Sequence, residues 1–98
     1  MNLASLTLPE FASRLGERFH LVASGATLEL ELVSADALSE QVQGSGRQPF
    51  SLVFRGPRGH ALPQCIHRLE SARLGVFEIF LVPIEPDPAG LRYEAVFS

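Results

Sequence analysis

The chain has a single cysteine, Cys65, so it cannot form an internal disulfide. One thiol fits a reducing compartment, and we expect a cytoplasmic protein. The longest apolar stretch, 79–84, is interrupted by a proline, whereas a membrane-spanning helix needs roughly 20 apolar residues. The first residues also lack a basic segment followed by an apolar one, so no secretory signal is expected. These absences predict a protein that is neither secreted nor inserted in a membrane.

Charge is also scarce. Eight arginines and no lysine stand against eleven acidic residues, which gives a net charge of -3. This mild charge gives no electrostatic reason to bind nucleic acid or an anionic membrane. Intrinsic disorder requires low hydrophobicity and high net charge, but 46% of the residues are hydrophobic. We therefore expect one folded domain over residues 1–98, with a single core.

The chain does contain a series of runs in which apolar and polar residues alternate. Alternation with a period of two places successive side chains on opposite faces of a β-strand. The pattern predicts strands over 18–23, 26–33, 50–55, 64–70, 76–84 and 92–97. Short connections between sequential strands favour a mainly β fold, a six-stranded antiparallel barrel or a curled sheet. The residues predicted to point inward from the second, third and fifth strands are Leu28, Leu30, Leu32, Phe50, Leu52, Phe54, Phe77, Ile79 and Leu81.

One short helix is expected before the first strand. Thr7 and Glu10 have the spacing of a capping box, and Gly16 is placed to end the helix. Phe11 and Leu15 are four residues apart, so both would lie on the face that docks over an open end of the sheet. The same helix is a candidate cover for the second apolar face of the strand at 76–84.

Two connections carry further expectations. Residues 34–48 have few bulky side chains and include Gly44-Ser45-Gly46, which predicts a long mobile loop with a helical turn around 37–40. That glycine-rich segment lacks the lysine and the strand–helix context of a phosphate-binding loop. Pro83 and Pro86 lie where the fifth strand is expected to lose its ladder hydrogen bonds.

His60, Cys65 and His67 form the cluster with metal-ligand chemistry. A zinc site needs three or four ligands at recognisable spacings, and this set does not have them. Cys65 and His67 share one strand face, but neighbours of this kind are expected to stand too far apart for nucleophilic catalysis. No metal site, no cofactor and no catalytic residue is predicted.

Two charged patterns have similarly plain interpretations. Glu29 and Glu31 share a strand face, and paired carboxylates do acid–base work when one lies in an apolar pocket. Here that face is expected to be solvated. Arg55 and Arg58 flank a Gly-Pro pair, and we interpret this segment as a loop at a strand end rather than as a nucleic-acid contact.

Phe80, Val82 and Val96 are apolar residues on the second face of the predicted sheet. If the helix does not cover them, they form an interface with a partner or with a second copy of the chain, because contiguous exposed apolar patches commonly mark such sites.

Several segments resemble an uncharacterised bacterial family of proteins of roughly a hundred residues. They are Phe50-Ser51-Leu52-Val53-Phe54-Arg55-Gly56-Pro57, Leu62-Pro63-Gln64, Leu69-Glu70, Leu74-Gly75, Phe80-Leu81-Val82-Pro83-Ile84 and Tyr93-Glu94-Ala95-Val96-Phe97, together with the start at 7–16. His67 and Ser98 depart from the family's aromatic and asparagine positions. The resemblance implies no catalytic residues. It implies an accessory or assembly role beside phage tail-collar-like proteins.

The leading hypothesis is therefore a non-enzymatic interaction module that binds a protein partner or itself. The resemblance implies that it belongs to a phage-tail-like particle. The alternative is a small-molecule-binding barrel gated by the 34–48 loop, which would need an apolar pocket above roughly 300 Å³. An enzyme or metal protein that uses His60, Cys65, His67 or the two glutamates ranks third.

Overall fold

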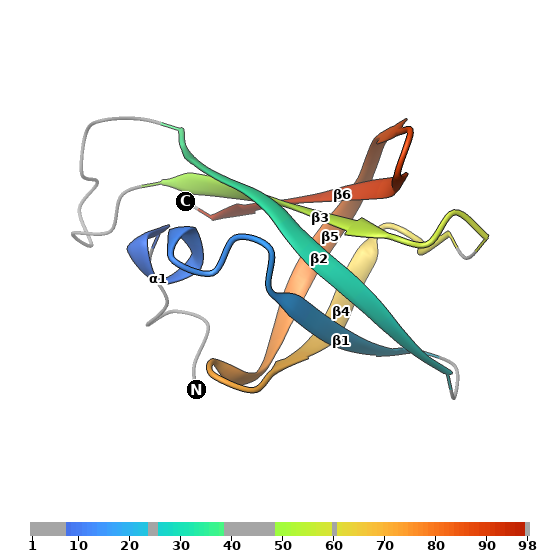
Figure 1. The fold of residues 1–98 in the computed structure, drawn as a ribbon, viewed down its shortest axis with the longest axis horizontal. Coiled ribbons are helices and arrows are strands. Elements are labelled where there is room, and N and C mark those ends of the chain that lie inside the picture. Colours follow the sequence, from blue (N-terminus) through green and yellow to red (C-terminus); the bar gives the residue numbers. More distant parts are fainter. Residues whose placement is uncertain (1–7, 24–25, 39–48, 60, 98) are drawn as a thin grey trace.

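The computed structural model describes residues 8–23, 26–38, 49–59 and 61–97. Its strands pair antiparallel in the order β1-β2-β3-β6-β5-β4, and β4 returns to β1 to close a barrel (Figure 1). This confirms the predicted β fold and decides in favour of the barrel. The elements are α1 (Leu8–Ala12), β1 (Arg18–Ala23), β2 (Ala26–Ala37), β3 (Phe50–Gly56), β4 (Cys65–Ser71), β5 (Gly75–Asp87) and β6 (Gly90–Phe97).

The barrel interior is filled by the apolar side chains that alternate along the strands. Leu30, Leu32 and the inward residues of β3 are fully buried, as their spacing predicts, while Leu28 is half-buried against them. Small barrels are normally filled in this way because only large side chains span the narrow interior. The other buried apolar strand residues are Phe19, Leu21, Leu69, Phe77, Ile79, Leu81, Tyr93, Ala95 and Phe97.

Helix α1 closes one end of the barrel. Its Phe11 is fully buried, and its ring lies 5.9 Å from that of Phe50, 6.2 Å from Phe77 and 5.8 Å from Phe97. The expected docking by Leu15 is wrong, because the helix ends at Ala12 and the Leu15 side chain is 53% exposed. Residue 7, the expected N-cap, lies outside the described residues.

Leu62 closes the opposite end. It is 5% exposed, and its backbone N–H donates a 3.0 Å hydrogen bond to the hydroxyl of Tyr93, which points inward from β6. The connection between β3 and β4 thus passes over the barrel end rather than away from it. A buried amide needs such a partner, because leaving it unpaired costs about 1–3 kcal/mol.

Strand β2 is longer than predicted. It runs to Ala37, and the pairing with β3 continues from Ser34 opposite Val53 to Ala37 opposite Phe50 after a register shift near Ser34. The expected loop over 34–48 is therefore wrong for its first four residues, and so is the helical turn at Ala37. Residues 39–48, with the glycine-rich segment, lie outside the described residues.

Strand β5 also exceeds its predicted length. It continues past both prolines to Asp87, with Pro83 opposite Tyr93 of β6. The ladder is interrupted further on, between Ile84 and Asp87, where the register shifts around Pro86. A proline is compatible with this position because a register shift already removes ladder hydrogen bonds there.

Candidate functional site

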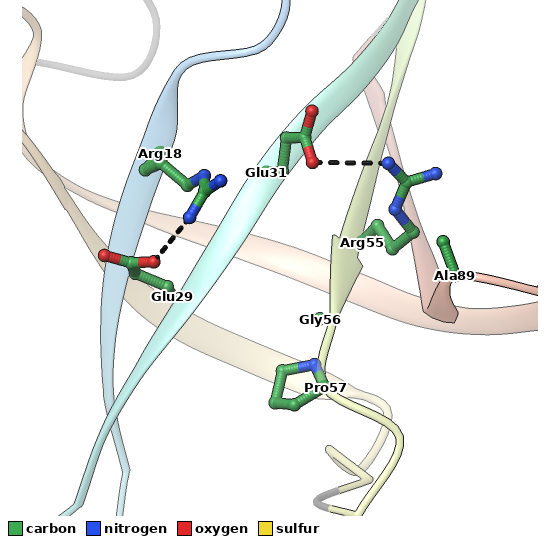
Figure 2. A pocket seen from close by; sticks show the side chains of 7 residues that line it. All are labelled: Arg18, Glu29, Glu31, Arg55, Gly56, Pro57 and Ala89. Carbon is green, nitrogen blue, oxygen red and sulfur yellow. Dashed lines mark hydrogen bonds and ion pairs between the residues drawn. The ribbon is translucent and has the colours of Figure 1, made fainter.

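A polar groove of about 320 Å³ lies on the outer surface of the barrel, open to solvent (Figure 2). It crosses β1, β2 and β3 and reaches the turn between β5 and β6. Charged side chains dominate its walls. The lining residues are Arg18, Glu29, Glu31, Arg55, Gly56, Pro57 and Ala89.

The strand register sets opposite charges side by side in this groove. Glu31 of β2 lies opposite Arg18 of β1 on one side and Arg55 of β3 on the other. Arg18 Nη1 donates to Glu29 Oε1 at 2.9 Å, and Arg55 Nη2 donates to Glu31 Oε1 at 3.2 Å. His20 adds a contact of 3.6 Å between its Nε2 and Glu29 Oε2. Both groove arginines are thus already engaged by carboxylates.

Arg55 also holds the turn between β5 and β6. Its Nη1 donates to Asp87 Oδ2 at 3.0 Å, and Arg58 Nη2 donates to the backbone carbonyl of Asp87 at 2.9 Å. Asp87 Oδ1 accepts the backbone N–H groups of Ala89 and Gly90, both at 2.9 Å. The two arginines lie at a strand end, as predicted, and their role there is to fasten a second hairpin.

The pKa of Asp87 lies below its ordinary value. Partial burial opposes ionisation of the carboxyl group, but the hydrogen bond from Arg55 and those from the Ala89 and Gly90 amides together outweigh it. The pKa of Arg55 is raised, chiefly by the hydrogen bond to Asp87, against the opposing effect of burial. A carboxylate held ionised in this way serves as a fixed anion rather than as a proton donor.

Backbone packing beneath the Arg55–Asp87 pair is tight. A Cβ atom added to Gly90 would collide with the carbonyl oxygen of Gly56, and one added to Gly56 would come within 2.7 Å of Leu30 Cδ2. Glycine at position 90 lets the start of β6 approach β3 this closely, and glycine at position 56 leaves room for the Leu30 side chain of β2. The close packing beneath the groove therefore depends on the absence of side chains at Gly56 and Gly90.

The glutamate pair does not have the environment of a catalytic acid and base. The side chains of Glu29 and Glu31 are 52% and 34% exposed, and each is bound to an arginine. A carboxyl group that acts as a catalytic acid needs an apolar pocket to raise its pKa, and the described walls of this groove are polar. The predicted solvent-facing position of these residues agrees with the structure.

Cys65 and His67 lie closer than expected. The distance from Cys65 Sγ to His67 Nε2 is 3.3 Å, so the prediction that they stand too far apart is wrong. The same Nε2 lies 2.9 Å from the carbonyl oxygen of Pro63. Because a carbonyl only accepts, this hydrogen bond requires a proton on Nε2, which then cannot act as a base toward the thiol.

A metal centre is not assembled in the described part of the chain. His60 lies outside the described residues, and no group of three or more histidine, cysteine or acidic side chains converges elsewhere. Cys65 and His67 alone fall short of the three or four ligands that zinc requires.

An apolar face, which we define as Ile66, Phe80, Val82 and Val96, lies on the outside of β4, β5 and β6. Ile66 is 65% exposed and lies directly opposite Phe80, which is 49% exposed. Val82 is half-buried and lies opposite Glu94, so Val96, two residues further along β6 and 61% exposed, is its diagonal neighbour.

Helix α1 does not cover the apolar face, because it packs against the barrel end instead; the expected cover is wrong (Figure 1). The sequence pattern predicts Phe80, Val82 and Val96 on this face, but it does not predict Ile66 there. Ile66 stands between Cys65 and His67, so it points to the opposite strand face from them. Counting back from the turn at Leu74-Gly75 would have placed Ile66 opposite Phe80 on the next strand.

A family model described as a domain of unknown function, DUF6916, matches residues 6–97, nearly the full length of the chain. The chain belongs to the DUF6916 family. No curated protein and no solved structure matches it. This agrees with the resemblance to an uncharacterised family that the strand and turn motifs indicate.

Those motifs have structural roles in this DUF6916 domain. Phe50 and Phe54 fill the core, Arg55 and Gly56 fasten the turn between β5 and β6, and Leu62 closes a barrel end. Sequence reasoning missed this role of Arg55, because its partner Asp87 is 32 residues away along the chain.

Two other expectations for the DUF6916 domain concern a small-molecule ligand and a membrane-spanning helix. The interior is filled by phenylalanine and leucine side chains, and the groove described above is charged, so neither offers the apolar pocket that a small-molecule barrel would need. No helix in the described part of the chain has the length and apolar character needed to cross a lipid bilayer.

Proposed function

We propose that this DUF6916 domain is a non-enzymatic interaction domain that binds another protein chain through its apolar face. The observation that carries the proposal is the pair of Ile66 and Phe80, side by side on neighbouring strands and 65% and 49% exposed. Aromatic and branched aliphatic side chains are costly to leave in water. Since about half of each side chain is already buried, covering the rest by a partner contributes about 1–2 kcal/mol each. Continuity with Val82 and Val96 extends the patch across three strands.

The chemistry of the polar clusters supports a non-enzymatic role. In the described residues, the groove carboxylates are held by arginines, and His67 Nε2 is held by the Pro63 carbonyl. These candidate acids and bases are thereby occupied by neighbours in the fold. Catalytic groups are instead expected to converge on a space where a substrate can bind.

The resemblance to a bacterial family supports a more specific version of the proposal. In that version the domain is a cytoplasmic accessory or assembly protein of a phage-tail-like particle, and the partner is another component of that particle. The apolar face is the surface by which it would join the assembly.

The proposal is tested by affinity capture from a bacterial host that encodes the chain, with matched variants. Phe80→Ser and Ile66→Ser alter the apolar face, whereas Leu15→Ser removes an apolar side chain of similar exposure (53%) next to α1. We expect a protein captured by the unmodified chain and by Leu15→Ser to be lost with either face variant. Circular dichroism and thermal melting establish that all variants remain folded. Capture that is unaffected by the face variants would contradict the proposal.

A further inference from the structure

Strand β4 is paired unequally on its two sides. Toward β5 it is paired along its whole length, from Cys65 opposite Leu81 to Ser71 opposite Gly75. Toward β1 the register covers only His20 opposite Glu70 and Leu21 opposite Leu69. Beyond this contact β1 and β4 diverge (Figure 1). The seam that closes the barrel is therefore short, and it leaves residues 65–68 of β4 without a strand neighbour on that side among the described residues.

The open edge has unpaired backbone groups. Along a strand, the N–H and C=O groups of alternate residues point to opposite sides, so two of the four residues from 65 to 68 direct theirs away from β5. In the described part of the chain, no backbone hydrogen bond outside the β4–β5 ladder involves these residues. A row of this kind is a template for a further strand, and natural proteins use it to bind extended peptides.

The apolar face borders this edge directly. Ile66 belongs to the open stretch of β4 and points outward, with Phe80 on its other side. A strand added next to β4 would bring its own outward side chains within about 4.5–5.5 Å of Ile66, Cβ to Cβ. Backbone pairing and apolar contact would then be made by the same segment.

The charge of Arg68 favours an added strand that carries an acidic residue. Arg68 is exposed on the same outer face, two residues from Ile66, and it forms no ion pair with a described residue. Glu78 lies opposite it on β5 but is not within ion-pair distance. An acidic residue on the added strand, two positions from its apolar anchor, would lie next to this unpaired guanidinium group.

We propose that the partner contributes an extended segment that pairs with residues 65–68 of β4 and packs an apolar side chain against Ile66 and Phe80. This inference rests on the proposed function and specifies the partner's chemistry: a β-strand with alternating apolar residues and an acidic residue placed to meet Arg68. The barrel would thereby gain a seventh strand at the β1–β4 seam.

The first test is amide hydrogen exchange on the full chain at low concentration. Two amides within 65–68 should exchange at least tenfold faster than those of Leu69 and Glu70, which are paired with β1 as well as with β5. Uniform protection at every concentration would overturn the proposal, because the edge would then be covered by the chain itself. Protection that increases with protein concentration would also overturn it, in favour of a second copy as the occupant.

The second test titrates the labelled full chain with a synthetic peptide, acetyl-Thr-Val-Thr-Glu-Thr-Val-Thr-amide, in which the glutamate lies two positions from each valine and on the same strand face, and follows the amide chemical shifts. A four-residue ladder implies weak binding, on the order of 1 mM or tighter. The matched control is the same peptide N-methylated at alternate residues, which cannot donate hydrogen bonds from one edge. Shifts should cluster at 65–68 and Phe80, and the control should bind at least tenfold more weakly.

A variant test addresses the charge preference. Arg68→Gln should weaken binding of the glutamate peptide but not of a glutamine version. If neither peptide shifts residues 65–68 at millimolar concentration while Phe80→Ser still abolishes capture, strand addition is wrong and the proposed apolar docking stands. If Phe80→Ser also leaves capture intact, the proposed function fails as well.

Discussion

Gly90 occupies a position that admits no side chain. An added Cβ would meet the Gly56 carbonyl oxygen and would lie 3.1 Å from Arg55 Cγ. We expect Gly90→Ala to lower the free energy of unfolding by about 1–3 kcal/mol, because backbone atoms cannot move aside as a flexible side chain can. Gly59→Ala is the matched control, since nothing lies within 4 Å of a Cβ there, and it should change stability by less than about 0.5 kcal/mol. Urea denaturation measures both, and equal effects would contradict the close approach.

Asp87 gives the protein an acid-sensitive contact. Its pKa is lower in the folded chain than in the unfolded chain, so the folded state binds fewer protons. The resulting stability is fully present above the unfolded pKa of about 3.9 and is lost as the pH falls through the lower, folded value. Asp87→Asn keeps an oxygen acceptor for the Ala89 and Gly90 amides but removes the charge.

We therefore expect Asp87→Asn to melt below the unmodified protein at pH 7, with a difference that shrinks as the pH is lowered below about 4. Added salt should also reduce the difference, because the Arg55 and Asp87 side chains are 28% and 25% exposed. Thermal melts followed by circular dichroism from pH 7 to pH 3 measure this. A constant difference across that range would show that geometry rather than charge is responsible.

At the scale of elements, α1 contributes to the stability of the fold mainly through one side chain. Phe11 is fully buried among three aromatic rings, whereas Leu15 lies past the helix end and is exposed. Phe11→Ala should destabilise the fold by about 3–5 kcal/mol, and Leu15→Ala by less than about 0.5 kcal/mol. Chemical denaturation of the two variants makes the comparison. Similar losses would mean that the helix docks along its length.

The elements also show what a local pattern can and cannot predict. Alternation located all six strands, because inward and outward side chains differ most clearly where one face is buried. It missed the end of β2, where Ser34, Ala35 and Asp36 have little apolar contrast and the pairing with β3 decides the structure. Helical spacing, in turn, predicted that Leu15 docks beside Phe11. This prediction fails because the spacing rule holds only while the helix continues, and the helix ends at Ala12.

At the candidate sites, contacts between residues far apart in the sequence determine features that the sequence pattern could not predict. The solvent-facing position of Glu29 and Glu31 followed from spacing alone. That Arg55 binds Asp87, and that Pro63 occupies the His67 nitrogen, depends on where two connections return to the barrel. The apolar face needed the β4–β5 register before Ile66 could be assigned to it.

At the scale of the whole molecule, the short seam between β1 and β4 limits the closure of the barrel. A disulfide between the paired positions His20 and Glu70, made as His20→Cys and Glu70→Cys with Cys65→Ser, would join them across the seam. Paired antiparallel residues have Cα separations that suit a disulfide. Oxidation should stabilise the protein by about 2–4 kcal/mol, because it closes a long loop in the unfolded chain.

The reduced form of the same variant is the control, and urea denaturation with and without reductant provides the comparison. If the disulfide forms but the two midpoints coincide, the seam does not limit stability.

Phe97 near the end of β6 stacks on Phe50 with their ring centroids 4.5 Å apart, and both contact Phe11 from the opposite end of the sequence. A deletion at the N-terminal side that includes Phe11, or one at the C-terminal side that includes Phe97, would therefore open the same end of the barrel. Affinity tags and fusion partners will need spacers that leave the packing of Phe11, Phe50 and Phe97 undisturbed. Two deletions more than eighty positions apart in the sequence should therefore destabilise the same end of the barrel.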